Sequence, residues 1–169
     1  MTRSRRLPIE PITDEITAFA FVLGVLFNQR MRADDAWQAP HALGLRLGGL
    51  TPTHVLATPE EDFTDLFAYP TAIHPFKRVM AARVYRTAEL IEATYDGDAR
   101  RLWDGATAGQ FLERFQAIPG VGRHKATVAL FVITRELGVD IQADDRRYSI
   151  SGCGSLAQRF YPHHEPLLV

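Results

Sequence analysis

Only one cysteine, Cys153, occurs among the 169 residues of the sequence. A single thiol cannot form an internal disulfide, and it cannot supply the four thiolates of an all-cysteine iron–sulfur cluster. The histidines are scattered or lie near the chain end, and none has the spacing typical of metal ligands. The sequence therefore predicts no disulfide framework, no metal site and no cofactor.

Long hydrophobic runs are also missing. The apolar segment 16–27 has about twelve residues, which is fewer than a membrane-spanning helix needs. Pro8, Pro11 and Asp14 interrupt the pattern of a signal peptide, in which a basic start leads directly into an apolar core. We therefore expect a buried helix here, no membrane partner, and a cytoplasmic protein that is associated with the nucleoid if it is bacterial.

The basic surplus that most nucleic-acid-binding proteins carry is absent, because 19 Lys and Arg face 20 Asp and Glu and the formal net charge is −1. The charges are unevenly distributed, however. Acidic residues concentrate in stretches such as 60–65. Basic residues form local groups elsewhere, namely Arg3, Arg5 and Arg6; Arg30 and Arg32; Lys77 and Arg78; Arg123 and Lys125; and Arg146 and Arg147. The composition thus allows a basic face without predicting one.

No segment shows the sustained alternation of a β-strand, whereas apolar residues recur at helical spacing along most of the chain. We predict an all-α fold with helices near 13–30, 33–47, 52–57, 59–68, 76–95, 108–117 and 123–137. Four of these helices are expected to be capped by the threonines that precede them, Thr13, Thr51, Thr58 and Thr107. The inner face of 76–95 is expected to consist of Val79, Ala82, Val84, Ala88 and Ile91.

The helices 108–117 and 123–137 are joined by the short segment Ile118-Pro119-Gly120-Val121-Gly122. Glycine accepts positive φ and has no side chain to obstruct a phosphate. Backbone N–H groups of this turn and of the next helix start could then bind an anion, with Arg123 and Lys125 adding positive charge. A plain corner between two helices is the alternative, since Pro-Gly turns are common. The order apolar-Pro-Gly-Val-Gly-Arg between two amphipathic helices favours DNA binding.

Segment 115–130 closely resembles the signature of the helix-hairpin-helix, glycine/proline-rich and aspartate (HhH-GPD) superfamily of DNA glycosylases, which includes endonuclease III-like and alkyladenine glycosylases. Weaker similarity covers about residues 18 to 145 and includes Leu26-Phe27-Asn28-Gln29 and Met80-Ala81-Ala82-Arg83. The iron–sulfur loop of some members is missing.

This resemblance implies an all-α fold in which a helical barrel carries the helix-hairpin-helix motif and packs on a second small helical lobe built from both chain ends. The barrel would cover residues 19–138, with the motif at 108–137. The second lobe would consist of 1–18 plus 139–169.

The resemblance also implies that a damaged base is flipped out of the duplex and that an Asp after the hairpin assists its departure. Such a carboxylate would stabilise the oxocarbenium-like sugar or activate water. Ala143-Asp144-Asp145 occupies that place, and Asp145 is the first candidate and Asp144 the second. The alternative is that these acids cap a helix or pair with Arg146 and Arg147.

Bifunctional members use a lysine directly after Gly-Arg as a Schiff-base nucleophile, but here His124 holds that position and Lys125 follows it. One residue turns a helix by about 100°, so Lys125 should miss the same pocket and instead contact a phosphate or stay solvated. His124 is expected to line the base pocket, stack on the base or lie at the surface. Gln29 resembles the polar residue that some members insert into the gap left by the flipped base, unless it is a helix-end residue facing water.

The leading hypothesis is therefore a monofunctional DNA glycosylase of base-excision repair, acting as a monomer on duplex DNA with Gly120, Val121, Gly122, Arg123, Lys125 and Gln29 as DNA contacts. The runner-up is a catalytically inactive helix-hairpin-helix protein that binds DNA or recognises damage. A helical protein-interaction domain without DNA contact is a third possibility.

Overall fold

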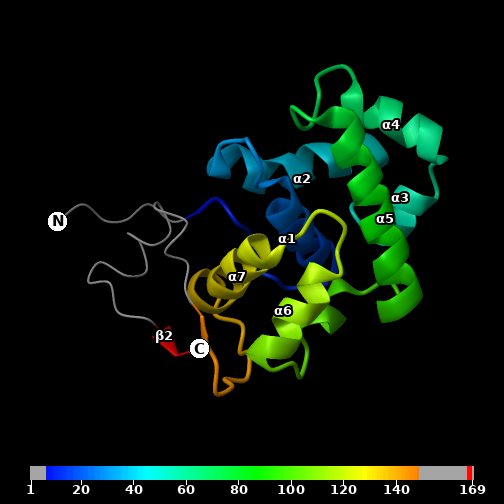
Figure 1. Cartoon of the computed structure of the whole chain (residues 1–169). Coiled ribbons are helices and arrows are strands. Elements are labelled where there is room, and N and C mark those ends of the chain that lie inside the picture. The colour runs from blue at the N-terminus through cyan, green and yellow to red at the C-terminus, as the bar shows by residue number, and fades with distance from the viewer. Residues whose placement is uncertain (1–6, 149–166, 169) are drawn as a thin grey trace. The chain divides into compact units, whose positions relative to one another are not determined.

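The computed structural model describes residues 7–148 and 167–168 of the chain (Figure 1). Its helices are α1 (Glu15–Phe27), α2 (Ala33–Leu47), α3 (Pro52–Leu56), α4 (Glu60–Ala68), α5 (Lys77–Tyr95), α6 (Ala108–Gln116) and α7 (Arg123–Phe131), with a 3-10 turn at Ala99–Leu102 and a π-helical turn at Val132–Glu136. The only strands within the described ranges, β1 (Arg147–Tyr148) and β2 (Leu167–Leu168), form a short antiparallel pair. The predicted all-α fold is confirmed.

The described residues form two compact units. Residues 8–101 and 118–120 make up one, here called the α1–α5 unit, and residues 7, 102–117, 121–148 and 167–168 belong to the other, the α6–α7 unit. This division places α6 and α7 with the segment that follows them, whereas the sequence prediction places them in a barrel of 19–138. The predicted lobes, 19–138 and 1–18 plus 139–169, stay a prediction.

Helix α1 is the centre of the α1–α5 unit, because its side chains from Phe19 to Phe27 are almost all buried. It begins at a capping box in which the Asp14 carboxylate accepts from the Thr17 N–H at 2.8 Å and the Thr17 hydroxyl oxygen accepts from the Asp14 N–H at 3.1 Å. The predicted cap, Thr13, is thus wrong by one residue, since the carboxylate of Asp14 takes that role.

Helices α1 and α2 approach closely at Gly24. A Cβ atom on Gly24 would lie 2.3 Å from Cε3 of Trp37, whose ring stacks on Phe21 with a centroid distance of 5.8 Å. Glycine in the middle of a helix costs backbone entropy, so this one is explained by the indole that packs over it. Helix α2 matches its predicted range and ends at Gly48, which has a positive φ.

Helix α3 begins at Thr51 and Pro52 as predicted, but the expected cap of α4 is wrong. The N-cap of α4 is Pro59, and Thr58 instead belongs to the end of α3, where its N–H donates to the Val55 carbonyl at 3.2 Å. Its own carbonyl accepts from the hydroxyl of Tyr85 at 3.2 Å. The backbone of Thr58 is therefore bonded to α3 and α5, and α4 begins without a side-chain cap.

Helix α5 packs against α3 and α4, as Figure 1 shows, but on a face rotated from the predicted one. Val84, Ala88 and Ile91 are buried as expected, whereas Val79 is 53% exposed and Ala82 is also exposed. The inner face is completed by other residues, Met80, Ala81 and Thr87. Because adjacent helix positions differ by about 100°, a small error in phase exchanges neighbours between core and surface.

In the α6–α7 unit, the capping box of Thr107 and Gln110 is confirmed, and Phe111, Leu112 and Phe115 form the buried face of α6. The rings of Phe111 and Phe115 stack with centroids 4.3 Å apart. The predicted helix 123–137 is regular only to Phe131 and continues as a π-helical turn, in which the Leu137 N–H donates to the Val132 carbonyl at 3.2 Å. Within the described ranges, no helix is long and apolar enough to cross a membrane.

Candidate functional site

The turn between α6 and α7 has the backbone that its glycines predict. Gly120 has φ +86°, a conformation that L side chains rarely adopt, and it is exposed. Gly122 is the N-cap of α7 and is extended, with φ −85° and ψ −179°. It has no side chain to cap the helix, so the N–H groups of the first turn of α7 lack a side-chain acceptor from that position. The turn thus has the glycine backbone expected from its sequence, and anion binding by its N–H groups stays a prediction.

The predicted contacts that follow the turn differ in exposure. Arg123 and His124 are exposed on the first turn of α7, and Lys125 is half-buried. The side chain of Val121 is only 4% exposed. A DNA contact by Val121 would therefore use its backbone, while Arg123 could reach a phosphate with its guanidinium. The predicted roles of these residues stay predictions.

Gln29 and Gly120, two of the predicted DNA contacts, meet the same side chain in the α1–α5 unit. Nη1 of Arg83 on α5 donates to Oε1 of Gln29 at 3.0 Å. A Cβ atom on Gly120 would lie 2.6 Å from Cδ and 2.7 Å from Nε of Arg83, so the turn packs directly against the Arg83 side chain. Nothing in the sequence pattern marks Arg83 as the partner of these two residues.

The loop that carries Gln29 is anchored where α1 ends. Nδ2 of Asn28 donates to the Gly24 carbonyl at 2.7 Å. His74 is fully buried, and its Nδ1 accepts from the Phe76 N–H at 3.0 Å, so Nε2 is the ring nitrogen that donates to the Phe27 carbonyl at 3.1 Å. His74 thus caps the end of α1 as a neutral imidazole, and Asn28 and His74 together hold the start of the loop.

The two candidate carboxylates lie after the π-helical turn in the α6–α7 unit, and Asp144 is held there by three residues. Its Oδ2 accepts from the Gly109 N–H at 2.7 Å and its Oδ1 from the Arg146 N–H at 2.9 Å. The hydroxyl of Tyr148 donates to Oδ1 at 2.9 Å and Oδ2 at 2.7 Å. We call Asp144, Gly109 and Tyr148 the carboxylate corner. Since Gly109 lies in the first turn of α6, Asp144 does cap a helix, which is the alternative that the sequence left open.

The carboxylate corner keeps Asp144 ionised and Tyr148 protonated. Partial burial raises the pKa of Asp144, but the hydrogen bonds from Tyr148 and from the N–H groups of Arg146 and Gly109 outweigh it and hold the pKa below its usual value. Burial, followed by the hydrogen bond to Asp144, raises the pKa of Tyr148 to about 12. The negative charge of Asp144 is therefore present at neutral pH and is already solvated by protein donors.

Asp145 has a different environment, because its side chain is exposed. It lines a pocket of about 300 Å³ together with Thr107, Gly109, Gln110, Glu113, Asp144 and Arg146. Arg146 is exposed at the same place, and the side chain of Arg147 lies outside the described residues. The choice between Asp145 and Asp144 as the catalytic carboxylate stays a prediction. Asp145 is the one that the corner leaves accessible to a ligand.

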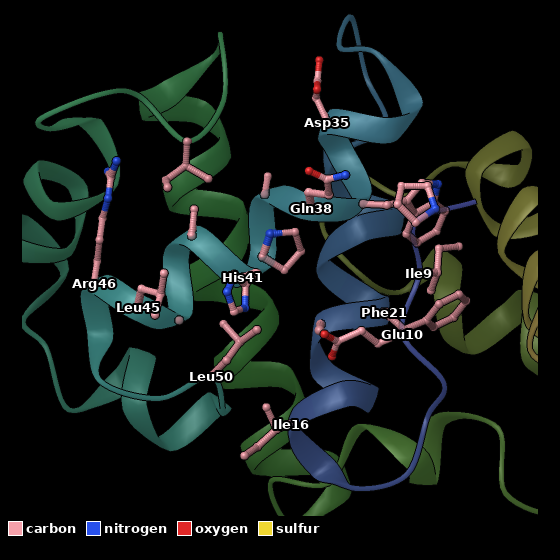
Figure 2. Close-up of a pocket in the computed structure, with 18 of the residues that line it drawn as sticks. Ile9, Glu10, Ile16, Phe21, Asp35, Gln38, His41, Leu45, Arg46 and Leu50 are labelled. Carbon is pink, nitrogen blue, oxygen red and sulfur yellow. The ribbon is translucent and has the colours of Figure 1, made fainter. Parts of the chain in front are cut away.

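A larger concavity of about 850 Å³ lies in the α1–α5 unit and was not predicted (Figure 2). Its lining comes from three segments, 8–21, 31–50 and 71–73, and is mostly apolar, with Phe21 and Leu50 among the side chains that Figure 2 labels. Since these segments are far apart in sequence, no local pattern could reveal it. Within the described residues, no group of three or more His, Cys, Asp or Glu side chains could hold a metal ion.

No protein-family model and no curated protein matches the sequence. Solved structures do match. A non-covalent endonuclease III–DNA complex has 20% identity and a TM-score of 0.51, with 76% of this chain and 52% of that chain covered. A trapped endonuclease III–DNA covalent intermediate, the estranged-adenine complex, has 18% identity and a TM-score of 0.55, with 85% and 57% covered. The 3-methyladenine DNA glycosylase I (TAG) of Staphylococcus aureus has 15% identity and a TM-score of 0.56, with 77% and 79% covered.

The chain has the fold of these DNA glycosylases. It spans just over half the length of the two endonuclease III chains. At identities of 20% or less, the likeness establishes how the helices are arranged and leaves the chemistry to be argued from the residues themselves. The all-α fold implied by the hairpin signature is confirmed.

Proposed function

We propose that the protein is a base-excision DNA glycosylase that binds duplex DNA through the turn between α6 and α7. The observation that carries this proposal is the turn itself. Gly120 has φ +86°, Gly122 begins α7 without a side-chain cap, and Arg123 is exposed beside them. Such a backbone binds phosphate and fixes the position of a duplex without reading its sequence. The fold shared with endonuclease III and 3-methyladenine DNA glycosylase I supports the proposal.

Asp145 is proposed as the catalytic carboxylate of a monofunctional enzyme. As the bond from C1′ of the sugar to the base nitrogen breaks, its electron pair leaves with the base and positive charge develops on the sugar. The Asp145 carboxylate would stabilise that charge and accept a proton from the water whose oxygen bonds to C1′, and a base that leaves as an anion would take up a proton from solvent. Asp144 would hold the segment against α6 and keep Asp145 in place. Because His124 stands where bifunctional enzymes have lysine, no strand cleavage is expected.

Single-turnover release of bases tests the proposal. Duplexes that carry deaminated, oxidised or alkylated bases are incubated with excess wild type, Asp145→Asn and Asp144→Asn. We expect release from one class of duplex, lowered about hundredfold or more in Asp145→Asn, with duplex binding retained. The same loss in Asp144→Asn alone would move the catalytic role to Asp144. Strand cleavage by the wild type would contradict the monofunctional assignment.

A catalytically inactive DNA-binding protein is the second candidate, and a specific observation favours it. The Asp144 carboxylate already accepts hydrogen bonds from Gly109, Arg146 and Tyr148. The Asp145 side chain is exposed to water and is not enclosed in an active site. Salt-sensitive duplex binding by the wild type without release of any base in the panel would establish this function instead. Absence of salt-sensitive binding would overturn both candidates and favour a protein-interaction domain.

A further inference from the structure

We infer that Arg83 is a positioning residue that couples the loop of Gln29 to the hairpin turn, so that Gln29 supports duplex binding only when Arg83 holds it. This inference rests on the proposed function, since it concerns how the chain grips DNA. Neither residue is near the other in sequence, and the coupling exists only because α5 lies beside both segments.

Two independent contacts place Arg83 in this role. Its Nη1 donates to Oε1 of Gln29 at 3.0 Å, in a hydrogen bond that spans 54 positions of sequence. The stem and Nε of the same side chain lie against Gly120, where an added Cβ would be 2.6 Å from Cδ, 2.7 Å from Nε and 2.9 Å from Cζ. A shift of the turn toward α5 would therefore move the guanidinium, and with it the amide of Gln29.

Arg83 and Arg86, which lie one turn apart on α5, differ in whether a carboxylate neutralises their charge. Arg86 is paired with Glu60 at 3.1 Å and with Glu89 at 2.8 Å. Among the described residues, Arg83 forms no ion pair with a carboxylate, and it donates instead to the neutral amide of Gln29. The guanidinium thus keeps its positive potential beside the turn.

The backbone next to Gln29 is suited to being held in this way. Arg30 has φ +50°, an uncommon conformation for a residue other than glycine, and its guanidinium lies 6.0 Å from the centroid of the Phe76 ring. The loop thus turns sharply directly after Gln29, and the start of α5 holds it on the far side of that turn. Arg83 supplies a contact that links this loop to the hairpin.

A double-mutant cycle in duplex binding tests the inference. Binding of a fluorescent duplex is measured over a range of salt for wild type, Arg83→Met, Gln29→Ala and the double variant. Met keeps the apolar stem and removes the guanidinium. We expect Arg83→Met to weaken binding about tenfold, as for loss of a charge-assisted hydrogen bond, and the double variant to be no weaker than Arg83→Met. Arg86→Met, which removes the same charge one turn further along α5, is the matched control and should bind within about twofold of wild type.

The salt dependence separates positioning from direct phosphate contact. A positioning residue lowers affinity without changing the slope of log affinity against log salt, whereas loss of a phosphate contact lowers that slope by about 0.9. If thermal unfolding shows that Arg83→Met is not folded, the cycle is run with Arg83→Lys, which keeps the charge but cannot span the same fork. Multiplicative losses from Arg83 and Gln29, or equal binding by Arg83→Met and Arg86→Met, would overturn the inference. A wild type that does not bind duplex would instead overturn the proposed function, and the inference with it.

Discussion

The guanidinium of Arg83 and the carboxylate of Asp144 each tie together segments that are distant in sequence, 54 positions apart for Gln29 and Arg83 and 35 for Gly109 and Asp144. Arg83 gives one hydrogen bond to a neutral amide in the α1–α5 unit and packs against a glycine turn. Asp144, in the α6–α7 unit, accepts from two backbone N–H groups and a tyrosine hydroxyl.

The difference between these two regions is in how much of each charge is left for a ligand. An ionised carboxylate has about four lone-pair positions, and the carboxylate corner occupies most of them. A guanidinium has five N–H donors, and the Gln29 contact uses one. The Arg83 guanidinium thus positions Gln29 and leaves positive potential beside the turn, whereas the carboxylate corner holds the chain at α6 and leaves its neighbour, Asp145, exposed.

The largest effect that would sharpen this comparison is expected at Gly120. Gly120→Ala should lower the free energy of unfolding by about 1–3 kcal/mol, because alanine is strained at positive φ and its Cβ would meet Arg83. Gly122→Ala is the matched control, since φ is −85° and no atom lies within 4 Å of the added Cβ. It should change stability by less than about 0.5 kcal/mol but weaken duplex binding, because the methyl group occupies the approach of a phosphate. Urea unfolding measures the stability of both variants, and duplex titration measures their binding. Equal stabilities of Gly120→Ala and Gly122→Ala would show that neither the positive φ nor the contact with Arg83 constrains position 120.

At the carboxylate corner, Asp144→Asn should lower the free energy of unfolding by about 1–2 kcal/mol. The substitution removes the charged carboxylate that accepts hydrogen bonds from Gly109, Arg146 and Tyr148. Asp145→Asn should leave stability unchanged within about 0.5 kcal/mol, since that side chain is exposed. Urea unfolding at pH 7 compares them. A larger loss in Asp145→Asn than in Asp144→Asn would show that the corner is assigned to the wrong acid.

A smaller effect is expected from the hydroxyl of Tyr148. Its pKa is raised to about 12, so its stabilising contribution is complete below the ordinary tyrosine pKa of 10.0 and is lost as the pH rises from there through 12. Tyr148→Phe should cost about 0.5–1.5 kcal/mol at pH 8, and the difference from wild type should shrink at pH 10 to 11. Urea unfolding across this range checks the trend, with Tyr95→Phe as the control for removal of a tyrosine. A difference that stays constant with pH would show that the hydrogen bond to Asp144 does not form.

The smallest effect on the fold is expected at Arg123, because its side chain is exposed at the start of α7. Arg123→Gln should leave unfolding unchanged and reduce the slope of log duplex affinity against log salt by about 0.9, as for one lost phosphate contact. Arg86→Gln, a surface charge that pairs with Glu60 and Glu89, is the control. An unchanged slope in Arg123→Gln would remove Arg123 from the DNA-contacting surface.

Local sequence determined much of the helical fold. The capping box of Thr107 and Gln110, the start of α3 at Thr51 and Pro52, and the end of α2 at Gly48 are set by hydrogen bonds and dihedral angles among neighbours, so the pattern alone predicted them. The turn between α6 and α7 is also a local feature. Gly120 adopts a positive φ there, and glycine is the residue that accepts this conformation most readily.

Tertiary structure decided which of several locally possible arrangements was used. Thr58 has the sequence of a cap, but its N–H donates within α3 and its carbonyl accepts from Tyr85. On α5, Met80 and Ala81 are buried while Val79 is exposed. For the same reason, the sequence did not reveal that Arg83 contacts Gln29 or that Tyr148 contacts Asp144. Their hydrogen bonds depend on where α5 and the segment after α7 lie in space, and a side chain's distant partner is fixed by packing, which no single stretch of sequence contains.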